Sequence, residues 1–305
     1  MLTDDIERYI GLRRSLGFKL KKPARHLQSF ARFATERGEG HIRAATAVAW
    51  AAAAPTPEAR HRWLGYVVRL ARFLRAEDPA HEIPPGKVFA TPKLRPVPYI
   101  YTREELARML ETAGQLQRQR PNPMRRQLYV MLFGLIAATG LRVSEALRLR
   151  LGDVLPGGVL HIRETKFNKS RLVPLHKSVV EALERYLDVR RRFGGSDDHL
   201  FLSVKGTALG YPAVNCTFRR VLQLANIAPG RTRRPRIHDL RHSFATRVLE
   251  QCSTDRDAVA RHFVGLATYM GHSDIAHTYW YLQATPELMT DIAAAAEALM
   301  AGVAA

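Results

Sequence analysis

A cluster of prolines constrains the architecture of this chain more than any other feature of its sequence. Six prolines fall within residues 78–99, DPAHEIPPGKVFATPKLRPVPY. Proline has no backbone N–H and clashes with the preceding helical turn, so no long helix can pass through this stretch. The sequence therefore predicts a helical domain at 1–80, an extended linker at 81–101 and a second domain at 102–305. A chain of 305 residues is long enough to bury two such cores.

The first of these domains has the apolar spacing of four helices. In the segment 57–78 the stripe contains Trp63, Val67 and Leu70, spaced for one helix face. The remaining positions of this helix carry several arginines, among them Arg62, Arg69 and Arg72. Such arginines form either a solvated face or a set of contacts to phosphate.

One stretch of the second domain changes its hydrophobic period. Residues 153–175, DVLPGGVLHIRETKFNKSRLVPL, are rich in β-branched side chains and contain a Pro-Gly-Gly turn and a polar turn. They predict a small three-stranded antiparallel sheet with Lys166 at the tip of its second hairpin. The flanking sequence is helical, with Thr102 and Glu105 spaced as a capping box. The predicted fold class is mainly α with a small antiparallel β-sheet (α+β).

The charge balance points to a polyanionic partner. The chain has 47 Lys and Arg against 28 Asp and Glu, a formal net charge of +19, and the excess is present in both predicted domains. Nucleic acid is the partner that most directly relieves such self-repulsion. The longest apolar run, at 128–141, is too short to span a bilayer and predicts a buried helix. Two cysteines far apart in sequence indicate a reduced, cytoplasmic protein with no membrane partner.

Four short stretches carry cationic or proton-transferring side chains. They are ATGLRVSEALRL, ETKFNKSR, IHDLRHSFAT and GHSDIAHTYWYLQATPEL. Each has an ordinary structural explanation when taken alone. His238 and His242, one helical turn apart, could even bind a metal ion, but no third ligand accompanies them and the sequence favours no metal site.

Taken together, the set resembles the signature of the tyrosine recombinases, the phage integrase family. The residues that carry this resemblance are Arg142, Lys166, His238, Arg241, His272 and Tyr281. It covers the whole chain and implies a helical core-binding domain that clamps DNA, followed by a tyrosine-recombinase catalytic domain. The implied activity is a site-specific DNA recombinase that cleaves and rejoins strands through a 3′-phosphotyrosyl intermediate, without metal, ATP or another cofactor.

The chemistry of these side chains agrees with the resemblance. A tyrosine has a pKa of about 10, so nearby cations and a proton acceptor must activate it at neutral pH. Arg142 and Arg241 can clamp the non-bridging oxygens of a phosphodiester through paired donors. His238 suits proton transfer near the attacking phenol. In the family pattern Lys166 protonates the leaving 5′-oxygen and His272 binds the phosphate.

Several alternatives remain open at this stage. Lys169 is the other candidate for the general acid, and Tyr279 is the other candidate for the nucleophile. Glu145 is expected to orient a buried arginine. Lys169 and Arg171 are either phosphate contacts or solvated turn residues. A type IB topoisomerase and a non-catalytic DNA-binding protein of the same fold are the competing functions.

The resemblance also implies partners and a location. They are a double-stranded DNA recombination site and a tetramer on two such sites. The apolar helix after Tyr281 would dock either on its own protomer or on a neighbour. The TYWYLQATPEL run is similar to transposon-borne members of the family. The expected location is the bacterial cytoplasm, in association with the nucleoid.

Overall fold

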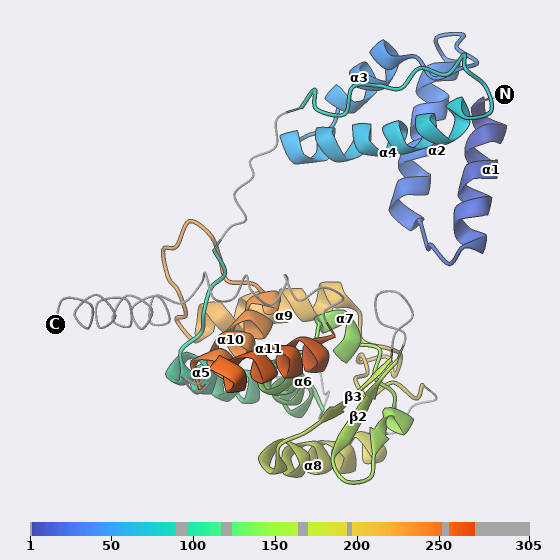
Figure 1. Cartoon of the computed structure of the whole chain (residues 1–305). Coiled ribbons are helices and arrows are strands. Elements are labelled where there is room, and N and C mark those ends of the chain that lie inside the picture. The colour runs from blue at the N-terminus through green and yellow to red at the C-terminus, as the bar shows by residue number, and fades with distance from the viewer. Residues whose placement is uncertain are drawn as a thin grey trace. The chain divides into compact units, whose positions relative to one another are not determined.

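The computed structural model describes residues 2–89, 97–116, 124–163, 170–193, 197–251 and 256–271, without the side chains of 256–259. Backbone contacts divide the chain into two compact units, with the division between Pro96 and Val97. Figure 1 colours the first unit blue to cyan and the second green to red.

The first unit packs four helices of the described chain around an aromatic core. They are α1 (Leu2–Ser15), α2 (Lys21–Thr35), α3 (Ala44–Ala52) and α4 (Pro57–Arg75). The rings of Trp50 and Trp63 stack with centroids 5.0 Å apart, and Phe30 contacts Trp50 edge-on at 5.4 Å. Val67 and Leu70 are fully buried on the inner face of α4. The helical stripe predicted for this segment is confirmed.

The proline-rich stretch is anchored at both of its ends. On the first unit, His81 is buried and its Nδ1 accepts the backbone N–H of Ile42 at 3.1 Å. On the second, Tyr101 is buried and its backbone N–H donates to Ser243 Oγ at 2.8 Å. The first unit thus includes residues 81–89, because prolines exclude helix but do not prevent the neighbouring side chains from packing.

The second unit is built around one buried helix. Its helices are α5 (Arg103–Gly114), α6 (Arg125–Thr139), α7 (Val143–Ala146), a 3-10 turn η1 (Leu151–Asp153), α8 (Lys177–Phe193), α9 (Tyr211–Leu224), α10 (Ile237–Glu250) and α11 (Arg256–Met270). α6 packs against α5, α8 and α10, and apolar side chains are buried around it. The buried helix predicted from the apolar run is confirmed. Among the described helices, none combines the length and apolarity that a membrane crossing needs.

A small sheet lies beside this helical core. Its strands β1 (Val154–Leu155), β2 (Val159–Ile162) and β3 (Arg171–Pro174) are antiparallel in the order β1-β2-β3. Leu160 pairs with Val173, and both side chains are buried on the same face. The predicted three-stranded antiparallel sheet is confirmed, and with it the mainly α fold with a small sheet.

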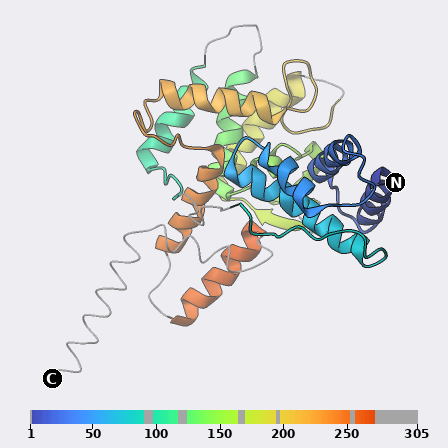
Figure 2. The same cartoon turned by 90° about the horizontal axis from the view of Figure 1, so that it is seen from above.

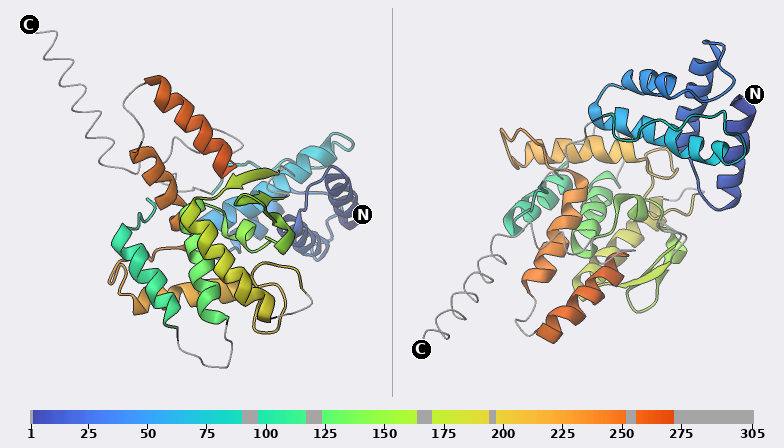
Figure 3. Two further views of the ribbon diagram at one scale, coloured as in Figure 1. Left: turned by 90° about the horizontal axis from the view of Figure 1, so that it is seen from below. Right: turned by 45° about the horizontal axis from the view of Figure 1, so that its top comes forward.

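The C-terminal end of α11 lies next to β3. Figures 2 and 3 show this approach from different directions. The hydroxyl of Tyr269 donates to the Pro174 carbonyl at 3.1 Å. Since α10 packs on both α6 and α11, the ends of four elements are brought together here: α6, α7, β3 and α11.

Candidate active site

A glycine ends α6 and leads the chain into the site. Gly140 has a φ of +62°, in the left-handed region that suits glycine at a helix C-terminus. A Cβ at this position would lie 2.5 Å from Cδ1 of Phe244 on α10. Both the backbone angle and the close approach of α10 therefore require glycine. The turn places Arg142 at the N-cap of the short helix α7.

Arg142 is held by Glu145, three residues later. Its Nη1 donates to Glu145 Oε1 at 2.6 Å, and its backbone N–H donates to Oε2 at 3.1 Å. The Glu145 side chain is only 1% exposed, whereas that of Arg142 is 29% exposed. The carboxylate thus fixes the arginine from inside, and the guanidinium stays accessible from outside. The predicted orienting role of Glu145 agrees with this geometry.

Arg241 is the largest fully buried side chain among the described residues, at 2% exposure. It projects from α10 and donates through Nη1 to the Gly140 carbonyl at 2.5 Å and through Nη2 to the Met270 carbonyl at 2.8 Å. A guanidinium stays charged in proteins, and its charge-assisted hydrogen bonds offset the loss of water. Arg241 therefore places a permanent positive charge beside the turn that carries Arg142.

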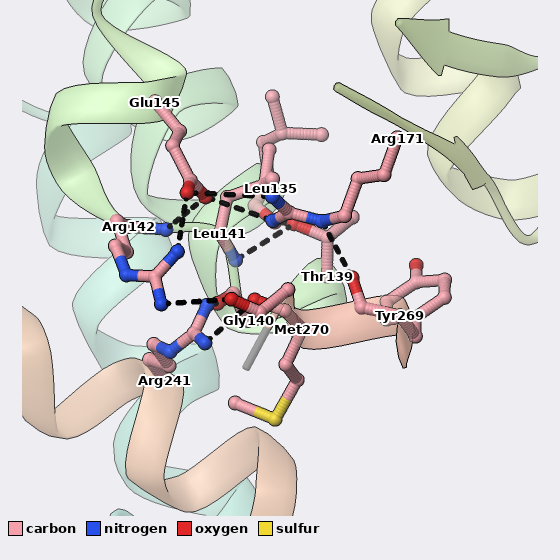
Figure 4. Close-up of polar contacts among 11 residues, drawn as sticks. Leu135, Thr139, Gly140, Leu141, Arg142, Glu145, Arg171, Arg241, Tyr269 and Met270 are labelled. Carbon is pink, nitrogen blue, oxygen red and sulfur yellow. Dashed lines mark hydrogen bonds and ion pairs between the residues drawn. The ribbon is translucent and has the colours of Figure 1, made fainter. Parts of the chain in front are cut away.

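Three guanidiniums converge on the C-terminal end of α11 (Figure 4). Arg171 Nε donates to the Tyr269 carbonyl at 2.8 Å, Arg241 to that of Met270, and Arg142 Nη2 to that of Gly271 at 3.1 Å. The last carbonyls of a helix have no partner within the helix and carry its negative partial charge. Cations from α7, β3 and α10 supply these missing donors, so the segment leading to residue 272 is held by all three.

His238 lies one helical turn before Arg241, at the start of α10. Displacement of water by surrounding protein, followed by repulsion from Arg241 and Arg236, lowers the pKa of His238 to about 4. The residue keeps an exposed face, so water and substrate can reach the ring. At neutral pH the imidazole is therefore uncharged and can accept a proton.

The structure brings together some of the predicted site residues. Arg142, Arg241 and His238 lie around the α6–α7 turn and α10. The other predicted residues of the site lie outside the described part of the chain: Lys166, Lys169, His272, Tyr279 and Tyr281. In the first unit Arg62, Arg69 and Arg72 are exposed on α4, on the side away from its buried stripe.

Arg171 differs from its expected placement. The sequence placed it in solvent or against phosphate, but its side chain is 10% exposed and forms an ion pair with Glu145 at 2.8 Å. The reason is the two-residue period of a strand: Arg171 shares a face of β3 with the buried Val173. That alternation was the signal in the sequence that could have identified Arg171 as an inward-facing residue.

Two groups of potential metal ligands occur among the described residues, and neither contains a predicted residue of this site. One contains His41, Asp78 and His81. Because His81 Nδ1 accepts a backbone N–H, its neutral ring carries the proton on Nε2, which leaves no lone pair there for a metal. The other consists of three consecutive residues, 197–199, in which the histidine Nδ1 already contacts Asp197 at 2.5 Å.

Comparison with known proteins gives one consistent result. A model of the phage integrase family matches residues 100–287. A protein of Sinorhizobium fredii (strain NBRC 101917 / NGR234) named as an integrase/recombinase, y4rB, is 37% identical over 295 residues, which is 94% of each chain. The tyrosine recombinase XerD of Brucella abortus (biovar 1, strain 9-941) is 29% identical over 255 residues, 83% of this chain and 80% of its own.

The fold agrees with these relatives. The structure of a lambda integrase tetramer bound to a Holliday junction aligns with a TM-score of 0.59 at 18% identity, over 89% of this chain and 77% of that one. The matched family region contains Arg142, His238 and Arg241, the described residues of the site. This chain belongs to the phage integrase family, and it is a site-specific DNA recombinase of the tyrosine-recombinase type.

Proposed function

We propose that Tyr281 is the nucleophile of this recombinase and that Arg142 and Arg241 stabilise the charge on the scissile phosphate. The observation that supports the proposal is the position of the two guanidiniums. They donate to neighbouring carbonyls, Gly271 and Met270, immediately before His272. A phosphate that reaches the accessible Arg142 therefore approaches two permanent positive charges at once.

Each strand exchange conserves the number of phosphate ester bonds. The phenol oxygen of Tyr281 attacks the phosphorus, the bond to the 5′-oxygen breaks, and a 3′-phosphotyrosine and a free 5′-hydroxyl result. A 5′-hydroxyl from the partner strand then attacks the phosphotyrosine and releases the enzyme. Because the arginines supply positive charge to the non-bridging oxygens, loss of either one should raise the barrier by about 3–4 kcal/mol, as for a lost oxyanion donor.

Proton transfer is assigned to the remaining residues. His238, which its lowered pKa keeps uncharged at neutral pH, is assigned the acceptance of a proton. Lys166, or Lys169 in its place, donates a proton to the leaving 5′-oxygen. His272 donates a hydrogen bond to the phosphate, next to the carbonyls that the arginines hold.

The first unit and the self-association complete the proposal. Residues 1–80 act as the core-binding domain, with the exposed Arg62, Arg69 and Arg72 as phosphate contacts. Residues 102–305 act as the catalytic domain. Four protomers assemble on two DNA sites, with exchange of the helix after Tyr281, and the lambda integrase tetramer is the structural relative that supports this assembly. The proposed location is the bacterial nucleoid.

A nicked DNA duplex tests the assignment of the nucleophile. The substrate is a duplex taken from inverted repeats identified in the DNA beside the gene, with a nick that traps the cleaved strand, and the product is a DNA adduct that resists SDS. We expect an adduct from the wild type and from Tyr279→Phe, and none from Tyr281→Phe. An adduct from Tyr281→Phe would overturn the proposal. Relaxation of supercoiled DNA without joining of two sites would instead identify a topoisomerase.

A further inference from the structure

Arg171, at the start of β3, contacts residues of two other elements. Its Nη2 donates to Glu145 Oε2 at 2.8 Å, its Nη1 approaches Oε1 at 3.4 Å, and its Nε donates to the Tyr269 carbonyl at 2.8 Å. The side chain is 10% exposed. These contacts link the sheet, α7 and the end of α11, and all three guanidinium nitrogens of Arg171 have partners within the protein.

The charge of the shared carboxylate explains why a second arginine is needed. Glu145 is buried and lies between the guanidiniums of Arg142 and Arg171. A carboxylate paired with Arg142 alone would neutralise the charge of that arginine. The resulting neutral pair would have little attraction for a phosphate. With Arg171 on its other side, the group of three carries one net positive charge in a site of low dielectric, where charge interactions are strong.

We propose that Arg171 is a positioning residue of the recombination reaction, which shares the charge of Glu145 so that Arg142 remains able to bind the scissile phosphate. The same side chain holds the end of α11 at the Tyr269 carbonyl. The proposal rests on the phosphate-binding role proposed for Arg142. It assigns to Arg171 no contact with DNA.

The ionisation of Glu145 supports this division of charge. Burial alone would raise the pKa of Glu145, but the hydrogen bond and charge of Arg171, followed by those of Arg142, lower it to about 2. The carboxylate is therefore held as an anion by both guanidiniums, and Arg171 carries part of a charge that Arg142 would otherwise balance alone.

The backbone beside Arg171 is fitted to its guanidinium. Gly271 has a φ of +68°, and a Cβ built on it would lie 2.7 Å from Arg171 Nη1 and 2.9 Å from Cζ. The guanidinium thus packs directly on the main chain of the residue that precedes His272. Arg171 controls two things at once: the charge available at Arg142 and the path of the chain into residue 272.

The test is a pair of single variants and their combination. Arg171→Met leaves Glu145 with Arg142 as its only guanidinium partner in this group. Single-turnover cleavage of the nicked duplex should therefore slow about tenfold or more. This is the scale of the loss when residues that hydrogen-bond to metal ligands are mutated. Arg171→Lys keeps the charge but loses the planar fork of donors. Its cleavage rate should lie between the rates of the wild type and of Arg171→Met. In the double variant Arg171→Met/Glu145→Gln the neutralising carboxylate is gone, and cleavage should be severalfold faster than in Arg171→Met.

A matched control separates charge from stability. Arg190 is a buried arginine of the same unit that donates to the carbonyls of Asp197 and His199, at 2.6 and 3.1 Å. Arg190→Met should lower the Tm while the folded protein cleaves at close to the wild-type rate. A purely structural role for Arg171 would move its Tm and rate together, and adding Glu145→Gln would restore neither.

Each outcome has a defined meaning. If Arg171→Met cleaves as fast as the wild type, or if the double variant is no faster than Arg171→Met, the inference about Arg171 is wrong. If the wild type forms no adduct, or Tyr281→Phe still forms one, the proposed function itself is wrong. The wild-type and Tyr281→Phe reactions, run beside the others, therefore distinguish the two failures.

Discussion

The guanidinium of Arg171 occupies the space in which a side chain on Gly271 would lie. The two residues are a hundred positions apart in sequence, yet a Cβ on Gly271 would come within 2.7 Å of Arg171 Nη1. Arg171 is fixed by Glu145 and by the Tyr269 carbonyl, so it cannot move aside without losing those contacts. The glycine that precedes His272 is thus required by a tertiary contact as well as by its backbone angle.

Substitution of this glycine should impair cleavage more than stability. Gly271→Ala adds the strain of a left-handed residue, about 1 kcal/mol, and also displaces the guanidinium of Arg171. Gly157→Ala is the matched control, because Gly157 has a φ of +77° with open space around its Cβ position. Calorimetric Tm values should fall similarly for both variants, whereas covalent adduct formation should fall only for Gly271→Ala. Equal rates of adduct formation in Gly271→Ala and Gly157→Ala would argue against a role for the contact between Gly271 and Arg171.

Replacement of Arg142 by lysine should slow cleavage despite the retained charge. Lysine is a point charge without a fork, so it cannot contact Glu145, the Gly271 carbonyl and a phosphate together. The expected loss is about 100-fold in the rate of adduct formation, the scale for a lost transition-state donor. Arg148→Lys, at an exposed position six residues later, provides the control. A rate loss shared by both variants would point to general weakening of DNA binding.

Acid should destabilise the second unit through its paired histidines. Burial, then repulsion by His238, lowers the pKa of His242 to about 3, and that of His238 is lowered to about 4. Unfolded histidines titrate near 6.5, so below that pH the unfolded chain binds more protons and stability falls as pH decreases. For the 8% exposed His242, the loss between pH 6.5 and 5 should be about 1–2 kcal/mol.

The comparison that checks this is the Tm at pH 7 and pH 5. His242→Gln removes one titrating group, so its Tm should decrease less over this interval than that of the wild type. An equal decrease in the two proteins would show that other groups determine the acid sensitivity.

The first unit should contribute to DNA affinity through its exposed arginines. Arg69→Ala removes a charge from α4, where the guanidinium lies 5.4 Å from the ring of Tyr66. We expect weaker duplex binding and a slope of log affinity against log salt that is smaller by about one. Arg8→Ala removes the same charge from an arginine that is paired with Glu77. If both variants lose affinity equally, net charge and not a phosphate contact explains the effect.

Chelation should leave the cleavage reaction unchanged. The permanent charges of Arg142 and Arg241 perform the task that divalent ions perform in many phosphoryl-transfer enzymes. Adduct formation in EDTA should therefore match that in magnesium. A loss that one particular divalent ion restores would contradict this assignment of charge.

Local patterns predicted the elements of this fold well. The apolar stripe of α4, the sheet and the capping box at the start of α5 all occur where the sequence places them. For example, Glu105 N–H donates to Thr102 Oγ1 at 3.1 Å and Thr102 N–H donates to Glu105 Oε2 at 3.0 Å. Such features depend on neighbours within a few residues, so one sequence contains the information needed to predict them.

The arginine network depended on information of another kind. Arg171 contacts Glu145 across 26 residues and Tyr269 across 98. No spacing rule relates such distant positions, and only the packing of β3 against α11 brings them together. The two-residue period of β3 could indicate that Arg171 faces inward, but it could not identify the carboxylate or the carbonyl that it contacts.

The carbonyls at the end of α11 make the length of that helix critical. Each residue of a helix turns it by about 100°, so one inserted or deleted residue within 256–270 would rotate the last three carbonyls away from their arginines. Substitutions on the exposed side of α11 leave those carbonyls in place. Among related recombinases that retain the three arginines, α11 should therefore vary in sequence far more readily than in the number of residues it contains.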